Sequence, residues 1–181
     1  MAFESLKRLF RPDPVREAGA ALYAGCVEQA RAPVFYARAG VPDTRDGRLD
    51  MLMLHVWLVT RQLRTPAGPD PLGQAVFDTL VRDLDDTYRE EGFGDAKVAR
   101  LVRGAAEQFY GRGRAYEAAL ATGDEAALRD ALARNVYADE GADADLLAAY
   151  VRRADGALSA EALRAGEAAF PALEEAIHEP G

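Results

Sequence analysis

The sequence has very few of the residues that build disulfides and zinc sites. It contains one cysteine, Cys26, and two histidines among its 181 residues. A single cysteine cannot form an internal disulfide, so nothing in the chain asks for an oxidising compartment. Zinc sites are usually assembled from cysteine and histidine side chains. We therefore expect a fold without disulfides, metal or other cofactor.

Basic residues are also in short supply. The chain has 22 Lys and Arg against 30 Asp and Glu, which gives a formal net charge of −8. Nucleic-acid phosphates are bound by clustered basic residues, so nucleic-acid recognition is not expected. The charge is uneven, because residues 1–64 carry 10 basic and 7 acidic groups while residues 123–181 carry 5 and 13. The first part of the chain is therefore the part that suits an anionic surface.

Long apolar runs are missing as well, since no 18 consecutive apolar residues occur, the length that a transmembrane helix requires. The first residues also lack the apolar core of a secretory signal peptide. Residues 1–14 instead predict a short basic amphipathic helix that ends at two prolines. Such a helix can lie on an anionic membrane. The candidate membrane-binding residues are Phe3, Leu6, Lys7, Arg8, Phe10 and Arg11.

Helical periodicity, interrupted by proline and glycine, divides the rest of the chain. Helices are predicted over residues 15–31, 33–40, 46–63, 71–91, 95–121, 124–137, 144–154 and 159–170. No alternation of useful length indicates a strand. We predict an all-α protein, a single-domain bundle of six to eight helices with the short N-terminal amphipathic helix in front. Residues 15–140 would form the main helical domain and residues 141–181 an acidic helical C-terminal extension.

The predicted helix 46–63 is unusual because it is apolar on every side except at His55. Such a helix is either central and covered by other helices, or it presents a hydrophobic face to a partner. Buried central helices are common in bundles, which favours the first interpretation. His55 itself has no Ser or Cys at a spacing that suggests a nucleophile. No catalytic residue is therefore assigned.

An acidic cluster offers one alternative of a different class. In all-α isoprenoid synthases, carboxylates four residues apart on a helix hold Mg²⁺ against a diphosphate, and Asp86 and Glu90 have this spacing. A helical Mg²⁺-dependent enzyme using Asp85, Asp86 and Glu90 is therefore an alternative. No second acidic motif accompanies the cluster, and neighbouring arginines favour a solvated helix face.

Two further features concern close packing and a pocket. Gly111 and Gly113 lie inside a predicted helix, where each glycine lowers helix stability by about 1 kcal/mol relative to Ala. Glycines at such positions predict close packing against another helix. The chain has one tryptophan, Trp57. A helical regulatory module that binds lipid or quinone in a pocket around Trp57 is the second alternative.

The segment from Gln29 to His55 contains a Phe35–Tyr36 pair, a Gly-Val-Pro-Asp-Thr turn at 40–44, a Gly-Arg-Leu-Asp step at 47–50 and a Leu-His pair at 54–55. With these motifs the segment resembles the ubiquinol–cytochrome c chaperone family. Further short matches follow in order at 84–85, 92–98, 109–112 and 135–137. The matched region covers about residues 20–140, and the ordered series is more specific than any single match.

The resemblance implies a non-enzymatic assembly chaperone that binds newly made cytochrome b and promotes assembly of the respiratory ubiquinol–cytochrome c reductase. Cytochrome b would be the client, and a small co-chaperone or the ribosome would be further partners. The protein would be cytoplasmic and peripheral on the inner membrane. We expect the surface around Phe35–Tyr36 and helix 46–63 to contact the client. The candidate partner-binding residues are Phe35, Tyr36, Arg48, Asp50, His55, Trp57, Asp85, Tyr110 and Arg112.

Overall fold

Capping side chains and prolines start most helices where the sequence predicts them. In this computed structural model, which describes residues 13–65, 68–139 and 141–173, Asp13 caps α2 (Pro14–Ala30) and Asp70 caps α5 (Pro71–Glu90). Thr44 accepts a hydrogen bond from Gly47 N at the start of α4 (Arg45–Gln62). Each cap satisfies a backbone N–H that the first helical turn leaves without a partner.

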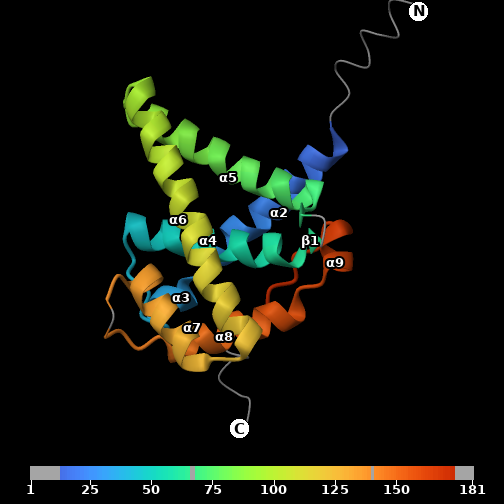
Figure 1. The fold of residues 1–181 in the computed structure, drawn as a ribbon. Helices are drawn as coiled ribbons and strands as arrows, with labels where there is room; N and C mark the ends of the chain where they lie inside the picture. The colour runs from blue at the N-terminus through green and yellow to red at the C-terminus, as the bar shows by residue number, and fades with distance from the viewer. Residues whose placement is uncertain (1–12, 66–67, 140, 174–181) are drawn as a thin grey trace, which may run out of the picture.

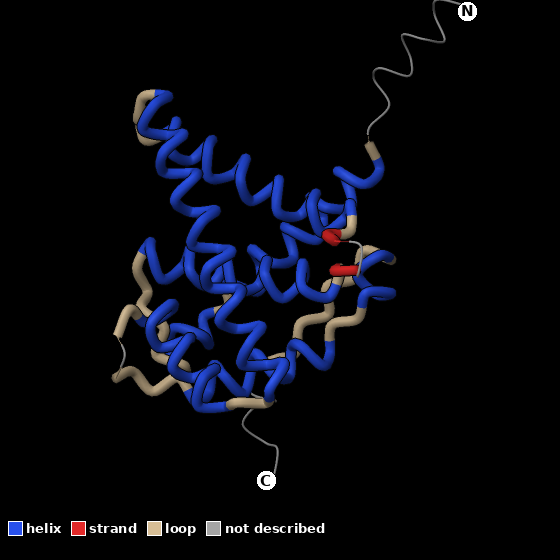
Figure 2. The backbone as a smooth tube through the Cα atoms, in the orientation of Figure 1, coloured by secondary structure: helices blue, strands red, loops and turns tan. Residues whose placement is uncertain are grey.

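Helices make up most of the described chain (Figure 2). The remaining helical elements are α3 (Pro33–Ala37), α6 (Asp95–Thr122), α7 (Glu125–Leu132), the π-helix η1 (Ala133–Tyr137), α8 (Asp145–Ala157) and α9 (Ala160–Arg164). Two short antiparallel strands, β1 (Arg64–Thr65) and β2 (Gly68–Pro69), join α4 to α5. The described residues therefore contain eight α-helices, and the prediction of an all-α bundle is confirmed.

Helix α4 lies at the centre of the bundle (Figure 1). It packs against α2, α5, α6, η1 and α8. Its residues Met51, Met53, Leu54 and all residues from Val56 to Val59 are buried. The core interpretation of this apolar helix is thus confirmed.

Buried residues from Leu22 in α2 to Leu173 form one hydrophobic cluster. Tyr150 and Val151 of α8 are completely buried in it, so both predicted segments, 15–140 and 141–181, contribute to the same core. Helices α5 and α6 meet at a turn at one extreme of the molecule and diverge from it toward the body (Figure 1). This divergence determines the position of the site described below.

The helix predicted over 33–40 ends at Ala37, and the one predicted over 144–154 continues to Ala157. Two further predicted helices differ more from the structure. The helix predicted over 159–170 ends at Arg164, because Gly166 takes a φ of +88° and Glu167 N donates to Ala162 O, a glycine-based helix stop. The helix predicted over 124–137 changes at Ala133 into the π-helix η1. Ala138 directly follows the π-helix, and its left-handed backbone conformation, with a φ of +53°, ends that helix.

The predicted N-terminal amphipathic helix, with its candidate membrane contacts Phe3, Leu6, Lys7, Arg8, Phe10 and Arg11, lies outside the described residues. Within the described parts of the chain, no helix combines the length and the apolar character needed to cross a bilayer.

Candidate functional site

An open, largely apolar groove lies between the end of α4, the start of α5 and the C-terminal half of α6. Its volume is about 650 Å³, within the range of ligand-binding clefts. We call it the Trp57 groove. Its lining includes Trp57, Arg61, Arg64, Asp70, Gly73, Gln74, Phe77, Phe109, Tyr110, Gly113, Arg114, Glu117, Ala118 and Ala121. The groove lies at Trp57, where the lipid- or quinone-binding alternative predicts a pocket.

The position of Trp57 depends on a glycine in the facing helix. A Cβ atom added at Gly113 would lie 2.6 Å from Trp57 Cδ1 and 2.7 Å from Nε1, so residue 113 must lack a side chain. The indole ring then packs edge-on against Tyr116, with ring centroids 5.2 Å apart. Close packing is confirmed at Gly113. At Gly111 nothing among the described residues lies within 4 Å of an added Cβ, so that glycine is not explained by packing within the described chain.

The aromatic side of the groove comes from α5 and α6. Phe77 stacks at an angle on Phe109 and on Tyr110, with centroid distances of 4.9 and 5.2 Å. Phe109 is buried, but half of Tyr110 is exposed to solvent. A half-exposed aromatic ring at the edge of an apolar cleft is typical of a binding surface, because it buries a large area at little entropic cost.

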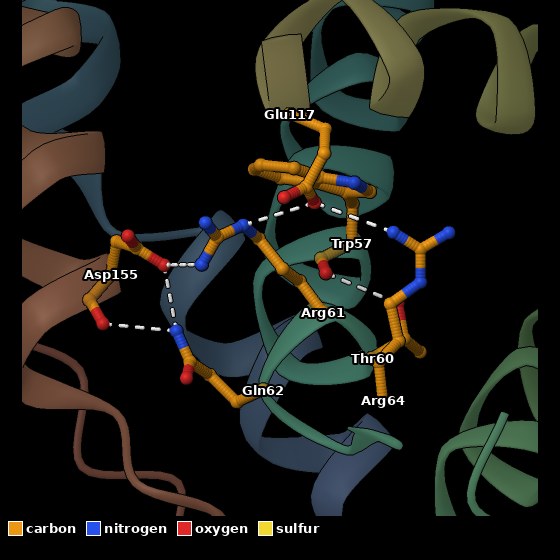
Figure 3. Close-up of polar contacts among 7 residues, drawn as sticks. All are labelled: Trp57, Thr60, Arg61, Gln62, Arg64, Glu117 and Asp155. Carbon is orange, nitrogen blue, oxygen red and sulfur yellow. Dashed lines mark hydrogen bonds and ion pairs between the residues drawn. The ribbon is translucent and has the colours of Figure 1, made fainter. Parts of the chain in front are cut away.

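A charged network forms one rim of the groove (Figure 3). The Glu117 carboxylate lies between two guanidinium groups, with Oε2 at 3.2 Å from Arg61 Nε and 3.3 Å from Arg64 Nη1. The Arg61 contact is an ion pair without hydrogen-bond geometry. Arg61 also pairs with Asp155 of α8, whose Oδ1 accepts a second bond from Gln62 at 2.7 Å. Burial raises the pKa of Asp155, against the lowering effect of Arg61.

The groove carries excess positive charge in a chain that is acidic overall. Three arginines and two carboxylates line it, and both carboxylates already have cationic partners. Asp70 accepts a 2.8 Å bond from Arg164, and this bond lowers the pKa of Asp70. Glu117 forms ion pairs with Arg61 and Arg64. Arg114 is exposed and pairs with none of the described carboxylates.

Phe35 and His55, two candidate partner-binding residues, are completely buried. His55 Nδ1 lies 2.7 Å from Met51 O and donates to it, which leaves Nε2 to accept from the Tyr150 hydroxyl at 2.8 Å. The Phe35 ring packs against His55 and Tyr150 at 5.4 and 4.8 Å. Burial lowers the pKa of His55 to about 4, so the ring is neutral at pH 7. A direct contact of these two side chains with a partner is inconsistent with their burial.

The candidates near the start of α4 each have a polar partner within the described chain. Tyr36 donates to Ala30 O at 2.6 Å, and Arg48 lies over its ring while pairing with Asp43. Asp50 forms a largely buried ion pair with Arg112 that connects α4 to α6 behind the groove. Burial raises the pKa of Asp50, and the bond from Arg112 opposes this rise.

The acidic cluster on α5 is arranged as a solvated face. Asp85 pairs with Arg89 at 2.5 Å, and Arg89 also pairs with Asp95. Asp86 and Glu90 are exposed. Over residues 13–65, 68–139 and 141–173, no group of three or more His, Cys, Asp or Glu could hold a metal ion. The Mg²⁺ alternative at Asp85, Asp86 and Glu90 therefore finds no support in the geometry.

The structure thus brings together two of the nine candidates, Trp57 and Tyr110, at one groove, with Asp50 and Arg112 behind it. Sequence reasoning missed the rim residues Arg61, Arg64, Arg114 and Glu117. Part of the signal was available, because Trp57, Arg61 and Arg64 recur at helical spacing on one face. Their partner Glu117 comes from a distant helix and could not be found by spacing.

Comparisons with known proteins agree on one family. A family model described as ubiquinol-cytochrome C chaperone matches residues 37–170. The crystal structure of the Cbp3 homolog from Brucella abortus is similar to this chain, with a TM-score of 0.77 and 34% sequence identity. This match covers 97% of this chain and 99% of that one. No curated protein sequence matches the chain.

Proposed function

Because the chain belongs to the ubiquinol–cytochrome c chaperone family, we propose that it binds newly made cytochrome b and promotes assembly of the respiratory ubiquinol–cytochrome c reductase. The family match and the similarity to a Cbp3 homolog support a chaperone role and a protein client. The identity of the client as cytochrome b is our proposal. The Trp57 groove is the observation that carries the proposed binding site.

A chaperone for a membrane protein needs apolar surface that is accessible without unfolding. The apolar helix α4 cannot supply it, because Met51, Leu54, Val56, Leu58 and Val59 are buried in the core. The Trp57 groove offers aromatic rings and small residues at the surface, with Tyr110 half exposed. Client segments that will later be buried in the membrane would be shielded there.

The proposed role is non-enzymatic. His55 is the side chain best suited to acid–base chemistry, but it is buried and neutral, and both of its ring nitrogens are hydrogen-bonded, to Met51 and to Tyr150. Its contacts hold α4 against α8 and serve the core. The proposal therefore requires binding surfaces and no reacting group.

The test is a pull-down from membranes of cells that are assembling the reductase. Tagged wild-type protein is recovered in mild detergent, and bound proteins are identified by mass spectrometry. We expect cytochrome b to be enriched with the wild type and with Ala99→Leu, an exposed change on α6 outside the groove. Ala118→Leu, which fills the groove from the same helix, should lose cytochrome b. No enrichment with the wild type would contradict the proposal. The same data report whether a small co-chaperone or ribosomal proteins accompany the client.

The groove also favours the second candidate, a module that binds lipid or quinone around Trp57. Trp57 is the one tryptophan of the chain, so its fluorescence reports directly on the groove. Saturable quenching by a soluble quinone or a brominated lipid, together with no cytochrome b in the pull-down, would support this module and replace the chaperone proposal.

A further inference from the structure

We propose that the Trp57 groove receives an apolar helix of the client that carries an acidic side chain beside Arg64 and Arg114. This inference rests on the proposed chaperone function and specifies the chemistry that the groove selects. Three properties of the described residues support it: the shape of the α6 wall, the aromatic lining and the balance of charge.

The α6 wall of the groove contains small residues near the end of the helix. Ala118 and Ala121 line it and are exposed, whereas the space beside Gly113 is occupied by Trp57. Small residues allow the backbone of a second helix to approach closely, as in packed membrane helices. The groove therefore suits a helix laid against α6, with its side chains directed into the space of about 650 Å³.

The aromatic lining supplies the apolar contact. Trp57, Phe77 and Phe109 form the inner surface, and Tyr110 stands half exposed at its edge. A helix that covers this edge would bury the exposed half of the Tyr110 ring. The energy of such burial favours leucine-like side chains over polar ones.

The charge balance selects one further feature of the helix. Asp70 and Glu117 are already paired, whereas Arg114 has no carboxylate partner among the described residues. Arg64 is about three-fifths exposed, and its contact with Glu117 is long at 3.3 Å. An occupant would remove water from these guanidinium groups, which is unfavourable unless it provides an acceptor. An acidic side chain on the helix provides one, and a basic side chain would be repelled.

The test uses three synthetic helical peptides of leucine and alanine that differ near one end, where they carry two glutamates, two glutamines or two lysines. Binding is followed by the fluorescence of Trp57. We expect the glutamate peptide to bind about tenfold more tightly than the glutamine peptide and the lysine peptide to bind most weakly. Ala118→Leu should abolish binding of all three.

Charge reversal separates selection by the groove from general attraction. In Arg114→Glu the preference should reverse, so that the lysine peptide binds more tightly than the glutamate peptide. Arg103→Glu changes an exposed arginine of α6 outside the groove and should leave the order unchanged. The same order of peptides in wild type and Arg114→Glu would overturn the inference.

The experiments distinguish a failure of this inference from a failure of the proposed function. Equal binding of all three peptides, with cytochrome b still recovered in the pull-down, would overturn the charge selection alone. Glutamate selectivity that reverses in Arg114→Glu, with no cytochrome b recovered, would support the groove chemistry and contradict the client identity. Saturable quenching by a brominated fatty acid without any peptide binding would overturn the helix as occupant.

Discussion

Gly113 of α6 lies against Trp57 of α4 so closely that a Cβ atom on residue 113 would come within 2.6 Å of the indole ring. This contact fixes the distance between the two helices beside the groove. Because the atoms in the way belong to a packed ring, a side chain at 113 can be accommodated only if the indole or the helix moves. The shape of the groove thus depends on a residue without a side chain.

Replacing this glycine should destabilise the protein although alanine is the better helix former. Gly113→Ala is expected to lower the free energy of unfolding by about 1–3 kcal/mol, because overpacking outweighs the gain in helix propensity. Gly104→Ala is the matched control, since nothing lies within 4 Å of an added Cβ there, and it should stabilise by about 0.5–1 kcal/mol. Urea denaturation measures both. Equal stabilities of the two variants would show that the contact does not constrain α4 and α6.

His55 should remain neutral at pH values where an ordinary histidine is half protonated. Burial lowers its pKa to about 4, whereas the unfolded chain has the ordinary value of about 6.5. The unfolded state therefore binds more protons between these values, and the contribution of His55 to stability falls as the pH falls from about 6.5 to 4. NMR titration of the histidine rings, with His178→Gln to assign them, should show that His55 does not titrate above pH 5. Titration of His55 near pH 6.5 would contradict its enclosure.

The ion pair between Asp50 and Arg112 should contribute measurably to stability because it is largely buried. Its side chains are 14% and 20% exposed, so removing one partner leaves a poorly solvated charge. We expect Asp50→Asn to lower the free energy of unfolding by about 1–3 kcal/mol. The exposed pair of Asp43 and Arg48 is the control, and breaking it should change stability by less than about 1 kcal/mol. A double-mutant cycle for each pair measures the coupling, and similar couplings would refute the distinction.

Residues 1–11 are predicted to hold the protein on anionic membranes. Their deletion should reduce flotation with liposomes that contain anionic lipid, since it removes four aromatic or leucine side chains and three basic ones. Thermal stability should change little. Full-length protein with Lys7, Arg8 and Arg11 changed to Gln tests the electrostatic part separately. Equal flotation of all forms would disprove this role.

Much of the fold could be predicted because the residues that start its helices lie directly beside those helices in the sequence. Asp13, Thr44 and Asp70 are capping residues directly before apolar periodic segments, and Pro71 stands at a first helical position. The central position of α4 followed from its apolar character on all sides. The early end of the last helix was missed because periodicity continues past Gly166, whose positive φ stops the helix.

The candidate site was predicted only in part, for a physical reason. Trp57 and Tyr110 could be singled out as large aromatic side chains, but exposure depends on what packs over each ring. Phe35 has the same local features as Tyr110 and is completely buried by His55 and Tyr150. The Glu117 bridge to Arg61 and Arg64 joins residues more than 50 positions apart, which only the fold brings together.

Binding of cytochrome b in the Trp57 groove is tested most directly by site-specific photocrosslinking in cells that are making cytochrome b. A photoreactive amino acid is placed at position 118, inside the Trp57 groove, or at position 99, on an exposed part of α6 outside it. We expect a crosslink to cytochrome b from position 118 and none from position 99. Crosslinks from position 99 alone, or equal crosslinks from both positions, would contradict the proposal that the client binds in the groove.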